Sequence, residues 1–187
     1  MTAPNGAYVT TTMSATNIVN DTFEEHVGAA LNTGRVDGTI NSFIIGAAVP
    51  VFTTERAGIG SYGGYYAWNT RLDGRLDTAP LAQFTMFNST WQSPVIGVAG
   101  YYQISDSMTL SGVLASMPFV RATWGAFDGR GQGWLANATL STHLLGQYYI
   151  DTSVRWISQT ASDTVAGVPI DSNAQSLEAV AAFKVRF

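Results

Sequence analysis

Apolar and polar residues alternate along most of this chain, and the alternation is clearest over residues 177–187. Every second residue there is apolar, and the intervening positions include Glu178, Lys184 and Arg186. Side chains of a strand point alternately to the two faces of its sheet, so this segment is predicted to be a strand with one continuous apolar face. That face needs a hydrophobic environment to contact.

The same period of two predicts strands along the rest of the chain. The predicted strands span residues 7–19, 39–51, 58–71, 81–91, 95–104, 108–117, 134–143, 147–156 and 177–187. Residues 21–31 fit either a short helix or a strand, and residues 32–38 have the composition of a turn. The chain is therefore predicted to be all-β, with eight strands after residue 38, or ten if both N-terminal segments are strands.

The predicted connections alternate in length towards the C-terminus. Residues 105–107 and 144–146 form short turns, whereas residues 119–133 and 158–175 are predicted as long polar loops. Antiparallel up-and-down barrels in membranes have short turns at one end and longer loops at the other. The spacing of the strands therefore favours such a barrel.

Charged residues are scarce. Asp, Glu, Lys and Arg make up 12% of the chain, whereas an ordinary soluble domain carries roughly 25%. Lys184 is the only lysine, although soluble sheets use lysine on exposed strands to prevent pairing with other molecules. No stretch reaches the roughly 18 consecutive apolar residues of a membrane helix. The composition favours a protein that meets a bilayer through its strands.

Several classes of function find no support in the sequence. The net charge is −4 and no run of basic residues is present, which disfavours nucleic acid as a partner. Cysteine is absent, which argues against a disulfide scaffold or a thiolate metal site. The two histidines, His26 and His143, are far apart and lack carboxylates at metal-ligand spacing. We expect neither a metal nor a cofactor.

The C-terminal strand ends on Phe187 after alternating apolar positions, and it resembles the closing strand of Gram-negative outer-membrane β-barrels, autotransporter barrels included. The resemblance implies an antiparallel up-and-down transmembrane β-barrel in the bacterial outer membrane. It implies the lipid bilayer, lipopolysaccharide and the barrel-insertion machinery as partners, with Phe187 as part of the insertion signal. Residues 39–187 would form the barrel. Residues 1–38 would add a strand pair, a plug helix or a periplasmic tail.

The polar faces of the last two predicted strands carry charges of both signs. Asp151 and Arg155 share a face because they are four residues apart, and Glu178, Lys184 and Arg186 share the equivalent face of the final strand. Isolated charges in a narrow barrel interior are costly, so these residues are predicted to pair in a lumen network. Its role is structural filling or, alternatively, an ion-selective constriction in a narrow pore.

Ser141 and His143 share a face, and Asp151 lies across the same predicted hairpin. These residue types permit a hydrolase hypothesis, in which the protein modifies outer-membrane lipids. No nucleophile motif surrounds Ser141, and the sequence favours a non-catalytic barrel with a structural, surface-loop or porin-like role. A soluble secreted β-domain that binds glycan or protein is the further alternative.

Overall fold

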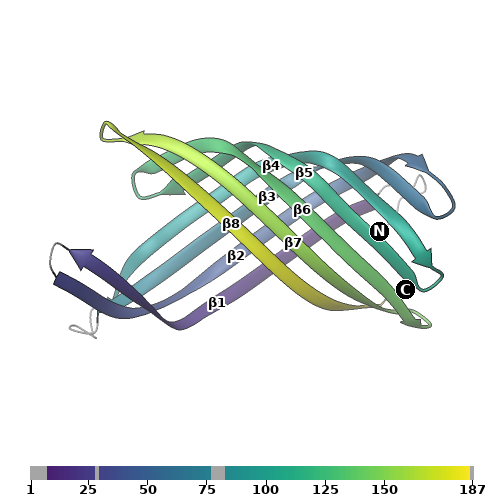
Figure 1. Ribbon diagram of the computed structural model, residues 1–187, viewed down its shortest axis with the longest axis horizontal. Helices are drawn as coiled ribbons and strands as arrows, with labels where there is room; N and C mark the ends of the chain where they lie inside the picture. The colour runs from purple at the N-terminus through teal and green to yellow at the C-terminus, as the bar shows by residue number, and fades with distance from the viewer. Residues whose placement is uncertain (1–7, 28–29, 77–82, 186–187) are drawn as a thin grey trace.

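Eight antiparallel strands make up the part of the chain that the computed structural model describes, which is residues 8–27, 30–76 and 83–185 (Figure 1). The strands are β1 (Tyr8–Val27), β2 (Ala30–Thr53), β3 (Ala57–Leu76), β4 (Gln83–Ser105), β5 (Met108–Trp124), β6 (Phe127–Leu145), β7 (Tyr148–Val165) and β8 (Val168–Val185). Each strand pairs with its neighbours in sequence, so the order across the sheet is β1 to β8. This is the predicted all-β, up-and-down topology. Within the described ranges, no helix has the length and apolarity needed to cross a membrane.

The sheet coils into a curved wall (Figure 1). Buried side chains pack together in its interior. The largest side chains that are fully buried include Tyr66, Met117 and Ile157, which come from three different strands. Within the described residues, β1 pairs with β2 alone and β8 with β7 alone. The curled sheet therefore has two outer edges, at its first and last strands.

The N-terminal segment is strand throughout its described part. Residues 21–27 continue β1, so the helical alternative for residues 21–31 is not what the chain forms there. The turn predicted at residues 32–38 is wrong, because this stretch lies inside β2 and pairs with both β1 and β3. Glycine and polar residues misled the prediction. Both kinds of residue fit a strand when each neighbouring strand satisfies its backbone hydrogen bonds.

The segments 81–91 and 95–104, predicted as two strands, are wrong as separate elements. Residues 83–105 form one strand, β4, with a register shift between Gln92 and Ile96 where it pairs with β5. Pro94 lies within this shift. A proline has no N–H for the ladder and is accommodated where regular pairing is interrupted. Seven strands therefore reach beyond Thr39, and β1 brings the number to eight.

The long loops predicted at residues 119–133 and 158–175 are also wrong. β5 and β6 are joined by a two-residue turn at Gly125 and Ala126, and β7 and β8 by a two-residue turn at Ala166 and Gly167. Gly125, Ala166 and Gly167 all have positive φ, as tight hairpin turns require. The polar residues that suggested loops lie on strands that extend far past the apolar segments.

One section of the sheet turns apolar side chains outwards. These residues form what we term the belt: Ile45, Val49, Ile59, Tyr65, Ile96, Val98, Tyr102, Leu110, Leu114, Phe119, Trp134, Tyr148, Ile150, Val154, Trp156, Leu177 and Phe183, all of them exposed. On β6 the outward apolar positions run from Trp134 to Leu144. Ten residues of strand rise about 33 Å, which at a tilt of about 40° spans about 25 Å. That is the height of the apolar band of an outer-membrane barrel.

The polarity reverses in the rest of the sheet, towards the turns at residues 125–126 and 166–167. We term this part the distal section. Its outward residues are polar, and its inward face carries buried apolar residues, among them Trp91, Val120, Phe127, Ile157 and Ala161, together with the buried polar Gln159. On β7 the change falls between Trp156 and Ser158, which are consecutive outward positions. The belt therefore exposes apolar side chains, as a membrane barrel does, and the distal section exposes polar side chains, as a soluble protein does.

One face of β3 carries Gly60, Tyr62, Gly64, Tyr66 and Trp68. Small residues beside large apolar ones on one strand face predict a lipid-facing surface, but this face points inwards. Tyr62 and Tyr66 are 4% and 1% exposed. These large rings fill the interior beside glycines of the same face. The mixture of small and large residues that suggested a lipid-facing surface is also what an interior of fixed width requires.

Two adjacent glycines of β3 give a matched test of how closely the backbone of β3 approaches that of β2. A Cβ on Gly64 would clash with the backbone oxygen of Ile45, whereas the nearest atom to a Cβ on Gly63 is 4.0 Å away. We expect Gly64→Ala to lower the free energy of unfolding by about 1–3 kcal/mol, as overpacking does elsewhere. Gly63→Ala should leave it nearly unchanged. Urea unfolding of both variants in detergent micelles measures the difference, and equal values would contradict the close approach.

Candidate functional site

The interior of the belt section holds an ion pair between the last two strands. Arg155 of β7 lies directly opposite Glu178 of β8, and its Nη1 is 3.2 Å from Oε2 of the glutamate. Their side chains are 10% and 24% exposed. The hydroxyl of Ser176 also donates to Glu178, over 3.2 Å.

The other members of the predicted lumen network are placed less completely. Asp151 faces inwards on β7 and is buried, four residues before Arg155 on the same face. Lys184 lies on β8 opposite Tyr149, but its side chain is outside the described part of the structure. Arg186 and Phe187, the predicted insertion signal, lie beyond the described residues altogether. The network therefore stays a prediction outside the Arg155–Glu178 pair.

The three residues of the hydrolase hypothesis lie on the inner face of β6 and β7. Ser141 is directly opposite Asp151, as the predicted hairpin requires. His143, however, contacts the adjoining turn: its Nε2 is 2.7 Å from the carbonyl oxygen of Gly146, and its ring stacks on Tyr149 at 4.7 Å. Nε2 must donate in that contact, which leaves only Nδ1 to act as a base. In the described residues no hydrogen bond joins Ser141 to His143 or His143 to Asp151.

Aromatic rings close the interior of the distal section. Trp124 lies between Trp91 and Phe127, with ring centroids 6.1 Å and 3.6 Å away. Below them, the amide of Gln159 donates to the sulfur of Met117 over 3.3 Å, and both residues are buried. We term Trp91, Met117, Trp124, Phe127, Ile157 and Gln159 the interior plug. The sequence prediction missed this plug because Trp124 and Phe127 were assigned to a loop.

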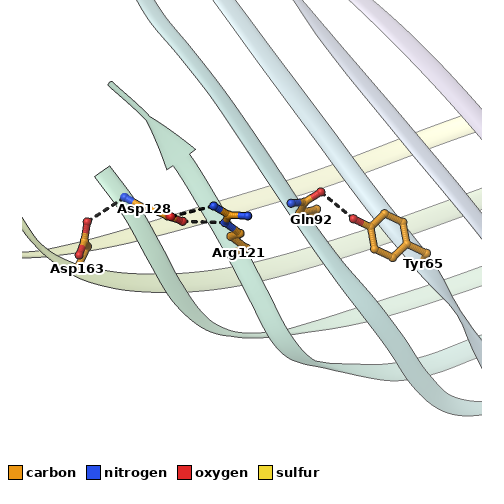
Figure 2. Close-up of polar contacts among 5 residues, drawn as sticks. All are labelled: Tyr65, Gln92, Arg121, Asp128 and Asp163. Carbon is orange, nitrogen blue, oxygen red and sulfur yellow. Dashed lines mark hydrogen bonds and ion pairs between the residues drawn. The ribbon is translucent and has the colours of Figure 1, made fainter. Parts of the chain in front are cut away.

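A row of outward polar residues runs across the distal section just past the belt. Gln92, Arg121, Arg130, Ser162 and Asp171 lie directly opposite one another on successive strands, from β4 to β8. We term these five residues the rim row. Tyr65 at the edge of the belt donates its hydroxyl to Gln92 over 2.7 Å (Figure 2). Ser162 donates to Asp171 over 2.6 Å.

Arg121 of the rim row is held by Asp128 on the neighbouring strand. Its Nε and Nη2 donate to the two carboxylate oxygens over 2.7 Å and 2.8 Å, and the backbone N–H of Asp128 donates to Asp163 (Figure 2). The hydrogen bonds from Arg121 hold the pKa of the Asp128 carboxyl below its usual value. The carboxylate therefore stays charged, and the pair stays formed, at pH values that would protonate an ordinary aspartate. In the sequence, Asp128 and Arg130 are two residues apart with glycine next to each, and this alternation was the one local pattern that could have predicted a strand here.

Among the described residues, no three His, Asp or Glu side chains come together in a way that could hold a metal ion. In the interior, Arg155 pairs with Glu178 and Asp151 is buried. On the outer surface, Arg71 pairs with Asp73 and Arg121 pairs with Asp128.

Comparison with known proteins gives one informative result. No protein-family model matches the chain, and a search of curated proteins finds no match. Among solved structures, the chain is similar to the outer membrane protease OmpT from Escherichia coli, with a TM-score of 0.60 and 12% sequence identity over 97% of this chain and 77% of that protein. The likeness shows that this chain has the fold of an outer-membrane β-barrel. At this identity it carries the fold alone.

Proposed function

We propose that this chain is an integral outer-membrane protein whose belt lies in the lipid bilayer and whose distal section stands outside it. The reversal of polarity carries the proposal. On one outward face of β7, Val154 and Trp156 are followed by Ser158 and Thr160, and the same change occurs at a matching height on the neighbouring strands. A bilayer of fixed thickness gives a physical reason for an abrupt change along a continuous strand.

The soluble alternative fits the belt poorly. Phe119 is 73% exposed and Leu177 is 74% exposed, and both belong to a surface that is apolar on every described strand whose side chains are placed. Soluble monomers rarely expose an apolar area of that extent. The first residue of β1, Tyr8, and the last residue of β8, Val185, both lie at the end of the belt that is opposite the distal turns. We therefore place the distal section on the external side, where it would meet lipopolysaccharide, and assign insertion to the barrel-insertion machinery.

The interior plug favours a structural or surface role over a pore. Met117 and Ile157 are completely buried, and the stacked rings of Trp91, Trp124 and Phe127 lie above them. An ion would have to displace these side chains to pass through the distal section. The hydrolase alternative gains no support, since His143 contacts the Gly146 carbonyl and not Ser141.

The absence of cysteine makes the position of the belt directly testable. Single variants Val154→Cys, Ser153→Cys and Thr164→Cys place a fluorophore on the belt, in the interior, and on the outer face of the distal section near its turn. In vesicles that contain phospholipid brominated on its acyl chains, we expect strong quenching at position 154 and weak quenching at 153 and 164. Equal quenching at 154 and 164 would contradict the proposed position of the bilayer.

Planar-bilayer recordings distinguish a barrel with a filled interior from a pore. The full chain, inserted and shown to be folded by heat-dependent gel mobility, is expected to give no discrete conductance steps, because the side chains of the interior plug are buried against one another in the distal section. Regular steps of reproducible size would contradict a plugged interior and restore the narrow-pore role.

A further inference from the structure

The rim row contains one cation that the fold does not use. Gln92 accepts from Tyr65, Arg121 pairs with Asp128, and Ser162 bonds to Asp171. Arg130 lies between Arg121 and Ser162 and is exposed. It attracts Asp128 through space but makes no hydrogen bond or ion pair with the described part of the sheet.

Arg130 also lies directly opposite another arginine. It faces Arg121 across the β5–β6 ladder, and like charges in directly opposed positions repel. Asp128 pairs with Arg121, and Asp163 on β7 accepts the backbone N–H of Asp128, so Arg130 is the guanidinium of this group that has no ion pair among the described residues. Asp171 lies two strands away from Arg130, and its carboxylate accepts the Ser162 hydroxyl. An anion placed between the two guanidinium groups would relieve the repulsion.

The height of this arginine pair identifies the kind of anion. Phe119, at the edge of the belt, is two residues before Arg121, and Trp134, also at the edge, is four residues after Arg130. The pair therefore lies about 7–13 Å along the strands past the apolar edge. The polar headgroup layer of a bilayer extends about 5–8 Å beyond the hydrocarbon on each side, and arginine side chains are long enough to cover the remaining distance. Guanidinium groups bind phosphate oxygens with paired, charge-assisted hydrogen bonds.

We infer that Arg121 and Arg130 together bind the phosphate of an anionic lipid headgroup in the leaflet that surrounds the outer edge of the belt. The inference rests on the proposed position of the belt and adds a specific lipid site to it. Arg121 is fixed in place by Asp128, and Arg130 is free to turn towards the ligand.

A fluorophore at Gln132→Cys tests this site, since residue 132 lies on the same face between Arg130 and Trp134. The full chain is placed in vesicles of phosphatidylcholine and phosphatidylglycerol, with bromine on the acyl chains of one lipid at a time. We expect brominated phosphatidylglycerol to quench more strongly than its share of the lipid predicts. Arg130→Gln should abolish that preference. Asp128→Asn, which removes the carboxylate that pairs with Arg121, should increase it.

Arg71→Gln is the matched control. Arg71 is equally an exposed, outward arginine of the distal section, but it is paired with Asp73 and lies on β3, away from the site. It should leave the preference at position 132 intact. A loss of equal size in Arg71→Gln and Arg130→Gln would overturn the site, since it would reflect general surface charge. Inorganic phosphate added to the protein in lipid-free detergent should leave the fluorescence at position 132 unchanged, and saturable binding there would assign the site to a free anion and overturn the lipid.

The label at Val154→Cys separates this inference from the proposed function. Quenching at 154 without any headgroup preference at 132 would overturn the lipid site and leave the membrane position standing. No quenching at 154 by either lipid would overturn both.

Discussion

Arg155→Leu is expected to destabilise the folded barrel by about 3–5 kcal/mol, the typical cost of leaving one member of a buried ion pair without its partner. Glu178 would then be a lone carboxylate in the interior, with only Ser176 to donate to it among its described contacts. Urea unfolding of the chain in lipid vesicles, followed by tryptophan fluorescence, measures the change.

The double variant Arg155→Leu with Glu178→Leu provides the control. Removing both charges eliminates the unpaired group, so most of the lost stability should return. If the single and double variants unfold at the same urea concentration, the loss comes from packing and the pair contributes little. This distinction matters because Arg155 also has a buried Nε without a hydrogen-bond partner. Its guanidinium is only partly satisfied in the folded state.

Val154→Lys is expected to cost about 2–4 kcal/mol, as lysine does on the lipid face of a barrel near the middle of a bilayer. Thr160→Lys, six residues further along the same outward face of β7, should cost about 0–1 kcal/mol because position 160 would be in water. Unfolding titrations in vesicles give both values.

The two lysine variants also distinguish a membrane barrel from a soluble one. If the belt were covered by another protein in water, both lysines could reach solvent at its margin and the difference would shrink. A larger cost at 160 than at 154 would place the bilayer at the wrong end of the strand. Both substitutions introduce lysine on the same outward face of β7, so the strand propensity of lysine affects the two variants alike and drops out of their difference.

The fold class could be predicted from the sequence because alternation is a local property. Asp151, Arg155 and Glu178 were placed on inward faces by counting residues in twos, and β7 shows the expected faces over its whole predicted length. The counting fails where the outward face of a strand changes from apolar to polar. Past Trp156 the outward residues of β7 are polar and apolar residues such as Ile157 and Ala161 are buried inwards, so the strand continues although its outward apolar pattern ends.

The same inversion hid the distal section. A polar stretch such as residues 158–165 has the composition of a loop, and no single residue in it indicates a strand. Its pairing with β6 and β8 is what makes it one. Likewise the inward sense of Tyr62 and Tyr66 depends on which side of β3 the sheet curls towards, and curvature belongs to the whole sheet. The rim row needs the register of five strands, which no local pattern contains.

Every pairing in the described sheet joins strands that follow one another directly along the chain, and this has a consequence for how the molecule assembles. A hairpin with a two-residue turn can form without closing a long loop, so its entropic cost is small. The strands can therefore be added one at a time, each pairing with the exposed edge of the strand that precedes it in the sequence. Of the contacts that a complete barrel needs, only one between β1 and β8 would join distant parts of the chain, and contacts of that kind form slowly. The rate at which the barrel is completed would then depend on that final meeting of the two edges.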